Sequence, residues 1–336
     1  MPLIPCDIDR LIASADEILA LQANEGLQLA KLAQMQAHSI GYIQGEIRAG
    51  LILGRAQLIL GELQSALNTL QHTLLMAVDG SLEKVQLLEQ IARCHFDLGD
   101  STLAAKLWQE CAQLAQEQQH YSPLIHAHIG LGQVYFGFEN YPSALHSHYQ
   151  AFDYLHTSSN TELRCRVYAN IVVDLLSLER LSEAAAMLQR LQDAALTQRS
   201  LSTDIETYRL KGLLDLANQQ VADARIHFAT ALKICHLQAN PWSEAMSLLG
   251  LGRCDLVDQE WANALAHLNQ ALDVACGLQN PHLLCKIHFA LSSCYEGLNE
   301  LHTAKTHLTE YLQYKQLLQP KQSGLSLPDK SASQAT

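Results

Sequence analysis

The segments 248–268, LLGLGRCDLVDQEWANALAHL, and 288–308, HFALSSCYEGLNELHTAKTHL, lie forty residues apart and share one pattern of small and apolar residues. In both segments a small residue precedes an alanine by twelve positions, and a leucine follows that alanine by four. The step is forty residues throughout, except for a first step of 38, and the alanine column reads Ala66, Ala104, Ala144, Ala184, Ala224, Ala264 and Ala304. A fixed period of this length indicates an array of similar structural units.

Two further columns accompany the alanines and predict that each unit is a helical hairpin. The first column is mostly small: Gly54, Ala92, Gly132, Val172, Gly212, Gly252 and Ser292. The second is mostly large and apolar: Leu70, Trp108, His148, Leu188, Phe228, Leu268 and Leu308. Small residues on two helices allow their backbones to approach, and large residues one turn away fill the space beside the contact.

Cap residues recur at the same step between the predicted hairpins. Asn160, Ser200, Asn240 and Asn280 are each forty residues apart, and a proline follows the last two. A side-chain cap followed by proline is typical of a helix start. Leu, Ala and Gln dominate the composition, with 8 Pro and 17 Gly, and no run alternates as strands do. We therefore expect an all-α chain.

The pattern resembles the tetratricopeptide repeat (TPR), on the evidence of Leu53-Gly54, Leu131-Gly132, Leu251-Gly252, Tyr135, Tyr295, and Phe228 with Ala231. The resemblance implies a right-handed superhelical α-solenoid of about eight stacked helix-turn-helix hairpins. The period of forty exceeds the usual 34 and resembles the sensory arrays of bacterial regulators. We expect a degenerate capping repeat in 1–42, seven TPR units in 43–318 and a disordered tail in 319–336. One residue before the small column lies a leucine column, which reads Leu53, Ile91, Leu131, Ile171, Lys211, Leu251 and Leu291. Lys211 interrupts this column, which predicts a loosened sixth unit or a buried salt bridge.

Charge and composition exclude several classes of function. The formal net charge is −12 and the pI is about 5.7, whereas nucleic-acid readers carry a basic face. No apolar stretch is long enough to span a bilayer, and residues 1–10 lack the apolar core of a signal peptide. Nine scattered cysteines without a Cys-x-x-Cys pair argue against a disulfide framework. We expect a cytoplasmic protein that contacts neither nucleic acid nor membrane.

Motifs for catalysis are missing, so we expect a protein that is not an enzyme and has no cofactor. The chain has no P-loop, no His-Glu-x-x-His and no Gly-x-Ser-x-Gly. Histidines cluster in the fourth unit, where His126, His128, His146 and His148 offer a site for zinc or for titration near neutral pH. The favoured interpretation is that these are ordinary, partly buried or exposed histidines. A second group, Cys276, His282, Cys285 and His288, matches no common zinc module.

In the TPR family the first helix of each unit lines the concave surface, which suggests where a partner binds. The inward positions carry a net charge of about +3, against −15 for the rest of the chain. The candidate groove residues are Arg48, Arg55, Arg93, Phe96, His126, Gln133, Phe136, Arg166, Arg209, Leu213, Met246, Arg253, Leu256, Lys286 and Phe289. A basic groove with apolar anchors favours an acidic-hydrophobic protein or peptide segment. The alternative is that these arginines pair with neighbouring acids and form only a solvated inner face.

The leading hypothesis is therefore a non-enzymatic adaptor or regulatory receptor for a protein or peptide segment. The alternative is the sensory input module of a bacterial signalling protein, of the diguanylate cyclase or transcription-regulator type, whose output domain is absent from this chain. A third hypothesis is a sensor of metal or pH that uses the histidines of the fourth unit. The sequence leaves a homodimer open.

Overall fold

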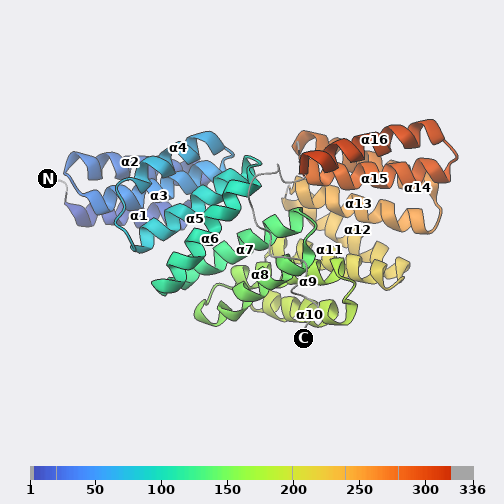
Figure 1. Ribbon diagram of the computed structural model, residues 1–336, viewed down its shortest axis with the longest axis horizontal. Coiled ribbons are helices and arrows are strands. Elements are labelled where there is room, and N and C mark those ends of the chain that lie inside the picture. Colours follow the sequence, from blue (N-terminus) through green and yellow to red (C-terminus); the bar gives the residue numbers. More distant parts are fainter. Residues whose placement is uncertain (1–3, 20, 199, 239, 279, 319–336) are drawn as a thin grey trace. The chain divides into compact units, whose positions relative to one another are not determined.

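The computed structural model describes residues 4–19, 21–198, 200–238, 240–278 and 280–318, and the tail predicted in 319–336 lies outside them (Figure 1). These residues form sixteen α-helices and one short 3-10 helix, without a strand. The all-α class predicted from the columns is confirmed. The α-helices are α1 Pro5–Leu19, α2 Ala23–Ser39, α3 Ile43–Ile59, α4 Leu63–Leu74, α5 Leu82–Asp97, α6 Ser101–Glu117, α7 Tyr121–Gly137, α8 Tyr141–Asp153, α9 Thr161–Ser177, α10 Leu181–Thr197, α11 Leu201–Ala217, α12 Val221–Gln238, α13 Pro241–Val257, α14 Trp261–Leu278, α15 Pro281–Gly297 and α16 Leu301–Leu318.

The forty-residue period arises from long helices joined by short turns. The first helices α9, α11, α13 and α15 each have 17 residues, and their partners α10, α12, α14 and α16 have 17 or 18. At the turns within the hairpins, one residue has a positive φ: Gly61, Gly99, Glu139, Glu179, Gln219, Gln259 and Asn299. This left-handed residue ends one helix and turns the chain back toward the next.

The predicted cap residues start their helices as the sequence indicates. The side chains of Asn160 and Asn280 accept hydrogen bonds from backbone N–H groups at 3.0 and 3.1 Å, and Ser200 does the same at 3.1 Å. Pro241 and Pro281 occupy the first turns of α13 and α15. Because a helix start leaves N–H groups without partners, these acceptors fix where each first helix begins.

Helices pack against one another through the small column. A Cβ added at Gly252 would lie 2.7 Å from Leu268, and one added at Gly212 would lie 2.8 Å from Phe228. Each column alanine is almost fully buried. α11 continues through Lys211, and the ammonium of this residue lies over the ring of Tyr208 at 5.4 Å. Lys211 is half-buried and makes no salt bridge within the described residues.

The chain divides into two compact units, of which unit 1 ends at Val134 and unit 2 begins at Tyr135. Unit 1 contains an apolar cluster that includes Ile8 and Leu19 and another that includes Leu70 and Leu87. Unit 2 has clusters around Phe228 and around Leu268 and Ile287. None of the described helices has the length and apolar character needed to cross a membrane.

Candidate partner-binding site

Three groove arginines of unit 1 are paired with acids. Arg48 lies 3.0 Å from Asp9, Arg55 lies 2.7 Å from Asp16, and Arg93 lies 2.9 Å from Asp97. Asp9 and Asp16 belong to α1, whose positions the charge estimate from the sequence did not include. These three arginines therefore follow the alternative given above, in which groove arginines pair with neighbouring acids. The first helices of unit 1 carry less uncompensated positive charge than the sequence suggested.

Arg209 of unit 2 is also paired, but it lies against an aromatic ring as well. Its side chain is buried and donates to Glu206 on the same helix, with Nε 2.9 Å from Oε2. The guanidinium carbon lies 5.4 Å from the ring centre of Trp242, the second residue of α13. Trp242 is 41% exposed. Trp242 is not among the residues predicted from the sequence, because it lies at the start of the helix, outside the repeating inward positions.

Arg253 and Lys286 differ from the other groove cations. Both side chains are exposed, and in the described part of the chain neither has a carboxylate within ion-pair distance. Arg253 lies on α13 and Lys286 on α15. The ammonium of Lys286 lies 5.8 Å from the ring centre of Phe136. We name Arg209, Arg253 and Lys286 the basic cluster of unit 2.

Two of these cations have lowered pKa values. The pKa of Lys286 is lowered to about 8, first by burial and then by the positive charges of Arg209 and Arg253. Burial also lowers the pKa of Arg253. The pKa of His282, one turn before Lys286, is lowered by burial and then by the charge of Lys286. Surrounding protein therefore desolvates these groups although solvent reaches part of each side chain, an arrangement that favours binding an anion.

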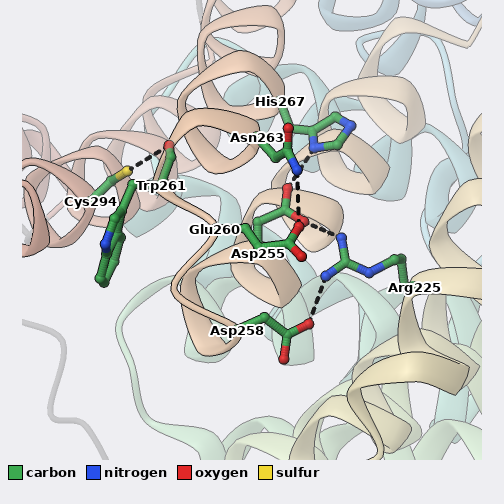
Figure 2. A network of polar contacts seen from close by, with 8 residues as sticks. All are labelled: Arg225, Asp255, Asp258, Glu260, Trp261, Asn263, His267 and Cys294. Carbon is green, nitrogen blue, oxygen red and sulfur yellow. Dashed lines mark hydrogen bonds and ion pairs between the residues drawn. The ribbon is translucent and has the colours of Figure 1, made fainter.

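A polar network holds the helix that carries Arg253 (Figure 2). Asp255 on α13 is fully buried, and its carboxylate accepts from Arg225 on α12 and from Nδ1 of His267 on α14, the latter at 2.7 Å. Arg225 also donates to Asp258 at 2.7 Å. Hydrogen bonds to both neighbouring helices fix α13 between them. Because a buried carboxylate needs such partners, this network also fixes the backbone two residues from Arg253.

Comparisons with known proteins agree with the fold. No protein-family model and no curated protein matches the sequence. Among solved structures, a Rap protein complexed with competence and sporulation factor has 12% identity and a TM-score of 0.66, covering 93% of this chain and 98% of its own. Aspartyl phosphate phosphatase F from Bacillus subtilis has 15% identity and a TM-score of 0.63, covering 95% of this chain and 86% of its own. A tetratricopeptide repeat protein from Parabacteroides merdae has 17% identity and a TM-score of 0.51, covering 80% and 93%.

This chain has the TPR fold. The resemblance drawn from the alanine, glycine and leucine columns is confirmed at that level, since identities below 20% carry the architecture and not the activity.

Some of the apolar residues proposed for the TPR groove pack against the core, and others are exposed. Leu213, Met246 and Leu256 are only partly buried, and they pack against the core clusters of unit 2. Phe289 is 53% exposed and its ring lies 5.1 Å from that of Tyr311. Phe136 lies against Tyr141 at 5.2 Å. Among these aromatic residues and Trp242, Phe289 and Trp242 are exposed, whereas Phe136 is half-buried.

The remaining groove candidates have diverse surroundings. In unit 1, Phe96 is half-buried with its ring 5.6 Å from that of Trp108, and Gln133 is half-buried as well. Nδ1 of His126 lies 2.9 Å from the carbonyl oxygen of Ser122. In unit 2, Arg166 is exposed on α9. The role of these four in binding stays a prediction.

The histidines of the fourth repeat lie in separate local contacts. His148 is buried, with Nδ1 2.5 Å from Oδ2 of Asp174, and burial raises the pKa of that carboxyl. His128 is buried and His146 is exposed. The described residues contain no group of three or more histidine, cysteine or acidic side chains that could hold a metal ion. Neither histidine group considered from the sequence is assembled as a metal site there.

Proposed function

We propose that this TPR protein is a non-enzymatic binding protein, and that its basic cluster in unit 2 holds an acidic segment of a protein or peptide. The observation that carries the proposal is that Arg253 and Lys286 have no acidic partner among the residues that the structure describes, whereas Arg48, Arg55, Arg93 and Arg209 have one. A partly desolvated cation gains most from an anion that reaches it. The guanidinium of Arg253 suits a carboxylate because it can donate two parallel hydrogen bonds.

Apolar side chains near the cluster support an acidic-hydrophobic ligand. Trp242 is 41% exposed and Phe289 is 53% exposed, and each lies on the same helix as one unpaired cation. Exposed aromatic residues beside charged ones are typical of binding hot spots. A Rap protein of similar fold has been crystallised in complex with competence and sporulation factor, and this likeness of fold is in keeping with a binding role.

The proposal is tested by reversing the two unpaired charges. Arg253→Glu with Lys286→Glu should weaken binding of a fluorescent acidic-hydrophobic peptide by at least about tenfold, since each lost charge-assisted contact is worth roughly 1.5–3 kcal/mol. Fluorescence anisotropy measures the affinity, with peptides that alternate Asp or Glu with Leu or Phe. Native-cell pull-down with mass spectrometry then identifies the physiological partner.

The matched control is Arg55→Gln with Arg93→Gln, which removes two paired arginines of unit 1. This control should change the affinity by less than about threefold, because exposed ion pairs contribute little. Equal loss of binding in both double variants would remove the basic cluster as the site. Unchanged circular dichroism must accompany each variant.

The other expectations from the sequence keep their status as predictions. They are the cytoplasmic location, the homodimer and the role as an input module for a diguanylate cyclase or transcription regulator. Reading the gene beyond the codon for Thr336 tests the last of these.

A further inference from the structure

The last helix that the structure describes, α16, exposes a stripe of leucines. Leu301, Leu308 and Leu312 are separated by seven and four residues, so they lie on one side of the helix. Their exposed fractions are 65%, 36% and 55%. We name these three residues the leucine stripe of α16. None of them belongs to the basic cluster of unit 2, so the proposed function does not account for the stripe.

The same positions of the preceding repeats are covered by the helix that follows. Forty residues earlier, on α14, they hold Trp261, Leu268 and Leu272. Leu268 is fully buried, and the other two pack against the core cluster that includes Ile287 of α15. On α12 the position of Leu308 is taken by Phe228, which is fully buried as well. The leucine stripe therefore continues an interface between hairpins that is closed by a further helix in the earlier repeats.

The first described helix, α1, has a polar exposed side instead. Its exposed residues include Asp7, Arg10, Ser14 and Glu17. Terminal repeats of solenoids need a polar outer face of this kind to remain soluble. This polar face argues against head-to-tail stacking, in which the stripe of one copy would pack on α1 of the next.

The charge of α16 is compatible with a second copy of this chain as the occupant. The whole chain has a formal charge of −12. α16 contains two lysines and one glutamate, which gives it +1 and leaves −13 for the rest of the chain. Two copies of equal net charge repel each other, and the repulsion is reduced where the contacting face is not acidic. Two acidic copies can therefore meet through α16.

We propose that the leucine stripe of α16 is a self-association surface, which pairs with the α16 of a second copy in a two-fold dimer. A self-complementary apolar patch closes in such a pair and leaves no free patch for further assembly. The two helices run antiparallel about the two-fold axis, and their leucines pack together as those of adjacent helices do within the array. The homodimer that the sequence leaves open thereby has a specific surface.

The concentration dependence of the oligomeric state tests the proposal. Because the stripe is short, the wild-type chain should pass from monomer to dimer between about 1 and 200 µM, in the range of weak interfaces. Sedimentation velocity measures this transition. Leu301→Glu with Leu312→Glu should weaken the dimer at least about tenfold, because each copy then brings two unpaired charges into the interface. A wild-type chain that stays monomeric would overturn the proposal.

The matched control replaces two exposed apolar residues on another second helix. Ile226 and Leu237 lie on α12, with exposed fractions of 62% and 73%. Ile226→Glu with Leu237→Glu should dimerise as the wild-type chain does, and circular dichroism checks that both double variants are folded. Equal weakening of the dimer in the two double variants would show that added negative charge, and not the stripe, controls the association.

Salt and truncation distinguish other occupants of the stripe. A dimer held by apolar contacts should persist or strengthen at about 0.5 M NaCl, since salt screens the repulsion between acidic copies. A dimer that dissociates in salt would be held by charge, contrary to the proposal. If the full chain is monomeric and a chain ending at Leu318 dimerises, residues 319–336 are the occupant and the proposal fails.

Crosslinking locates the contact between the copies. Light and heavy isotope-labelled chains are mixed and treated with an amine-reactive crosslinker, and mass spectrometry identifies the mixed pairs. Lys305 of one copy should be joined to Lys305 or Lys315 of the other, because both lysines lie on α16. Mixed pairs that involve only lysines outside α16 would contradict the proposal. It does not rest on the proposed function, since neither the stripe nor its test involves the basic cluster.

Discussion

Phe228 shows how single residues set the spacing of the array. Its ring contacts Gly212 on α11 and Gly250 on α13, where an added Cβ would lie 2.8 and 2.5 Å from ring carbons. The same side chain therefore packs within its own hairpin and against the next one. Contacts this close are below those that real Cβ atoms make, so the ring and the two glycines determine how near α11 and α13 approach α12.

Gly250→Ala should destabilise unit 2 by about 1–3 kcal/mol, because the methyl group would overlap the buried ring of Phe228. Gly277→Ala is the matched control, since Gly277 lies in α14 with no atom within 4 Å of an added Cβ. It should leave stability unchanged or raise it by up to about 1 kcal/mol through helix propensity. Urea unfolding followed by circular dichroism measures both. A similar loss of unfolding free energy in the two variants would show that the Phe228 ring moves to accommodate the methyl group. The contact would then not set the spacing of the helices.

At the same scale, the sequence predicted which residues lie on the inner helices better than which of them are unpaired. The Arg93–Asp97 pair could be foreseen, because the two residues lie one turn apart on one helix. Arg55 pairs with Asp16 from a different hairpin. A count of charges at the repeating inward positions does not include partners from other hairpins. Whether Arg253 and Lys286 have acidic partners depends on side chains from three helices, α11, α13 and α15. The sequence alone could therefore not predict that these two cations are unpaired among the described residues.

The hairpin of α15 and α16 is an element with an unusual interior of paired rings. Nδ1 of His288 lies 3.0 Å from Nδ1 of His307. The ring of Tyr295 stacks on His307 at 5.3 Å, and Tyr314 stacks on His288 at 5.7 Å. One imidazole must donate to the other, which requires that at least one ring be neutral. Burial lowers the pKa of both histidines, His307 lowers that of His288 further, and Glu310 opposes the shift.

This hairpin should lose stability in acid. Because the folded-state pKa values lie below the ordinary value of 6.5, the unfolded chain binds more protons in the window just below that pH. The stabilising contribution is therefore present above about pH 6.5 and decreases as the pH falls toward the folded-state values. Urea unfolding at pH 7.5 and 5.5 should show a smaller loss for His307→Gln than for the wild-type protein. Equal losses in the two proteins would contradict the assignment of the acid sensitivity to this pair.

At the scale of elements, the recurring cap residues were the best predicted feature. The acceptors Asn160, Ser200, Asn240 and Asn280 recur at a step of forty residues, and each caps the helix that follows. α11 runs through Lys211 without a break, and the long aliphatic side chain of this residue can cover apolar surface while its ammonium lies over Tyr208. A column of residue types does not show that a lysine side chain can pack in this way.

At the scale of the whole molecule, the repeat period and the division into compact units do not coincide. Ala104 and Ala144 keep the forty-residue step on either side of the boundary, yet unit 1 ends at Val134. Each unit has its own apolar clusters. The sequence could not predict the division, because the columns describe contacts between neighbouring helices and those contacts repeat throughout. In such arrays stability is the sum of local terms, so the two units can unfold separately.

Phe228→Ala should therefore destabilise unit 2 alone. Removing a fully buried ring leaves a cavity and costs about 3–5 kcal/mol in the cores of globular proteins. Amide hydrogen exchange followed by mass spectrometry should show faster exchange in α11, α12 and α13, while α3 and α5 of unit 1 keep their wild-type protection. Trp108→Ala is the matched variant in unit 1, where the ring is buried beside Gly130, and it should give the reverse pattern. Equal loss of protection in both units for either variant would contradict this prediction. It would mean that the two units unfold as one cooperative array, in which the loss of one side chain destabilises every repeat.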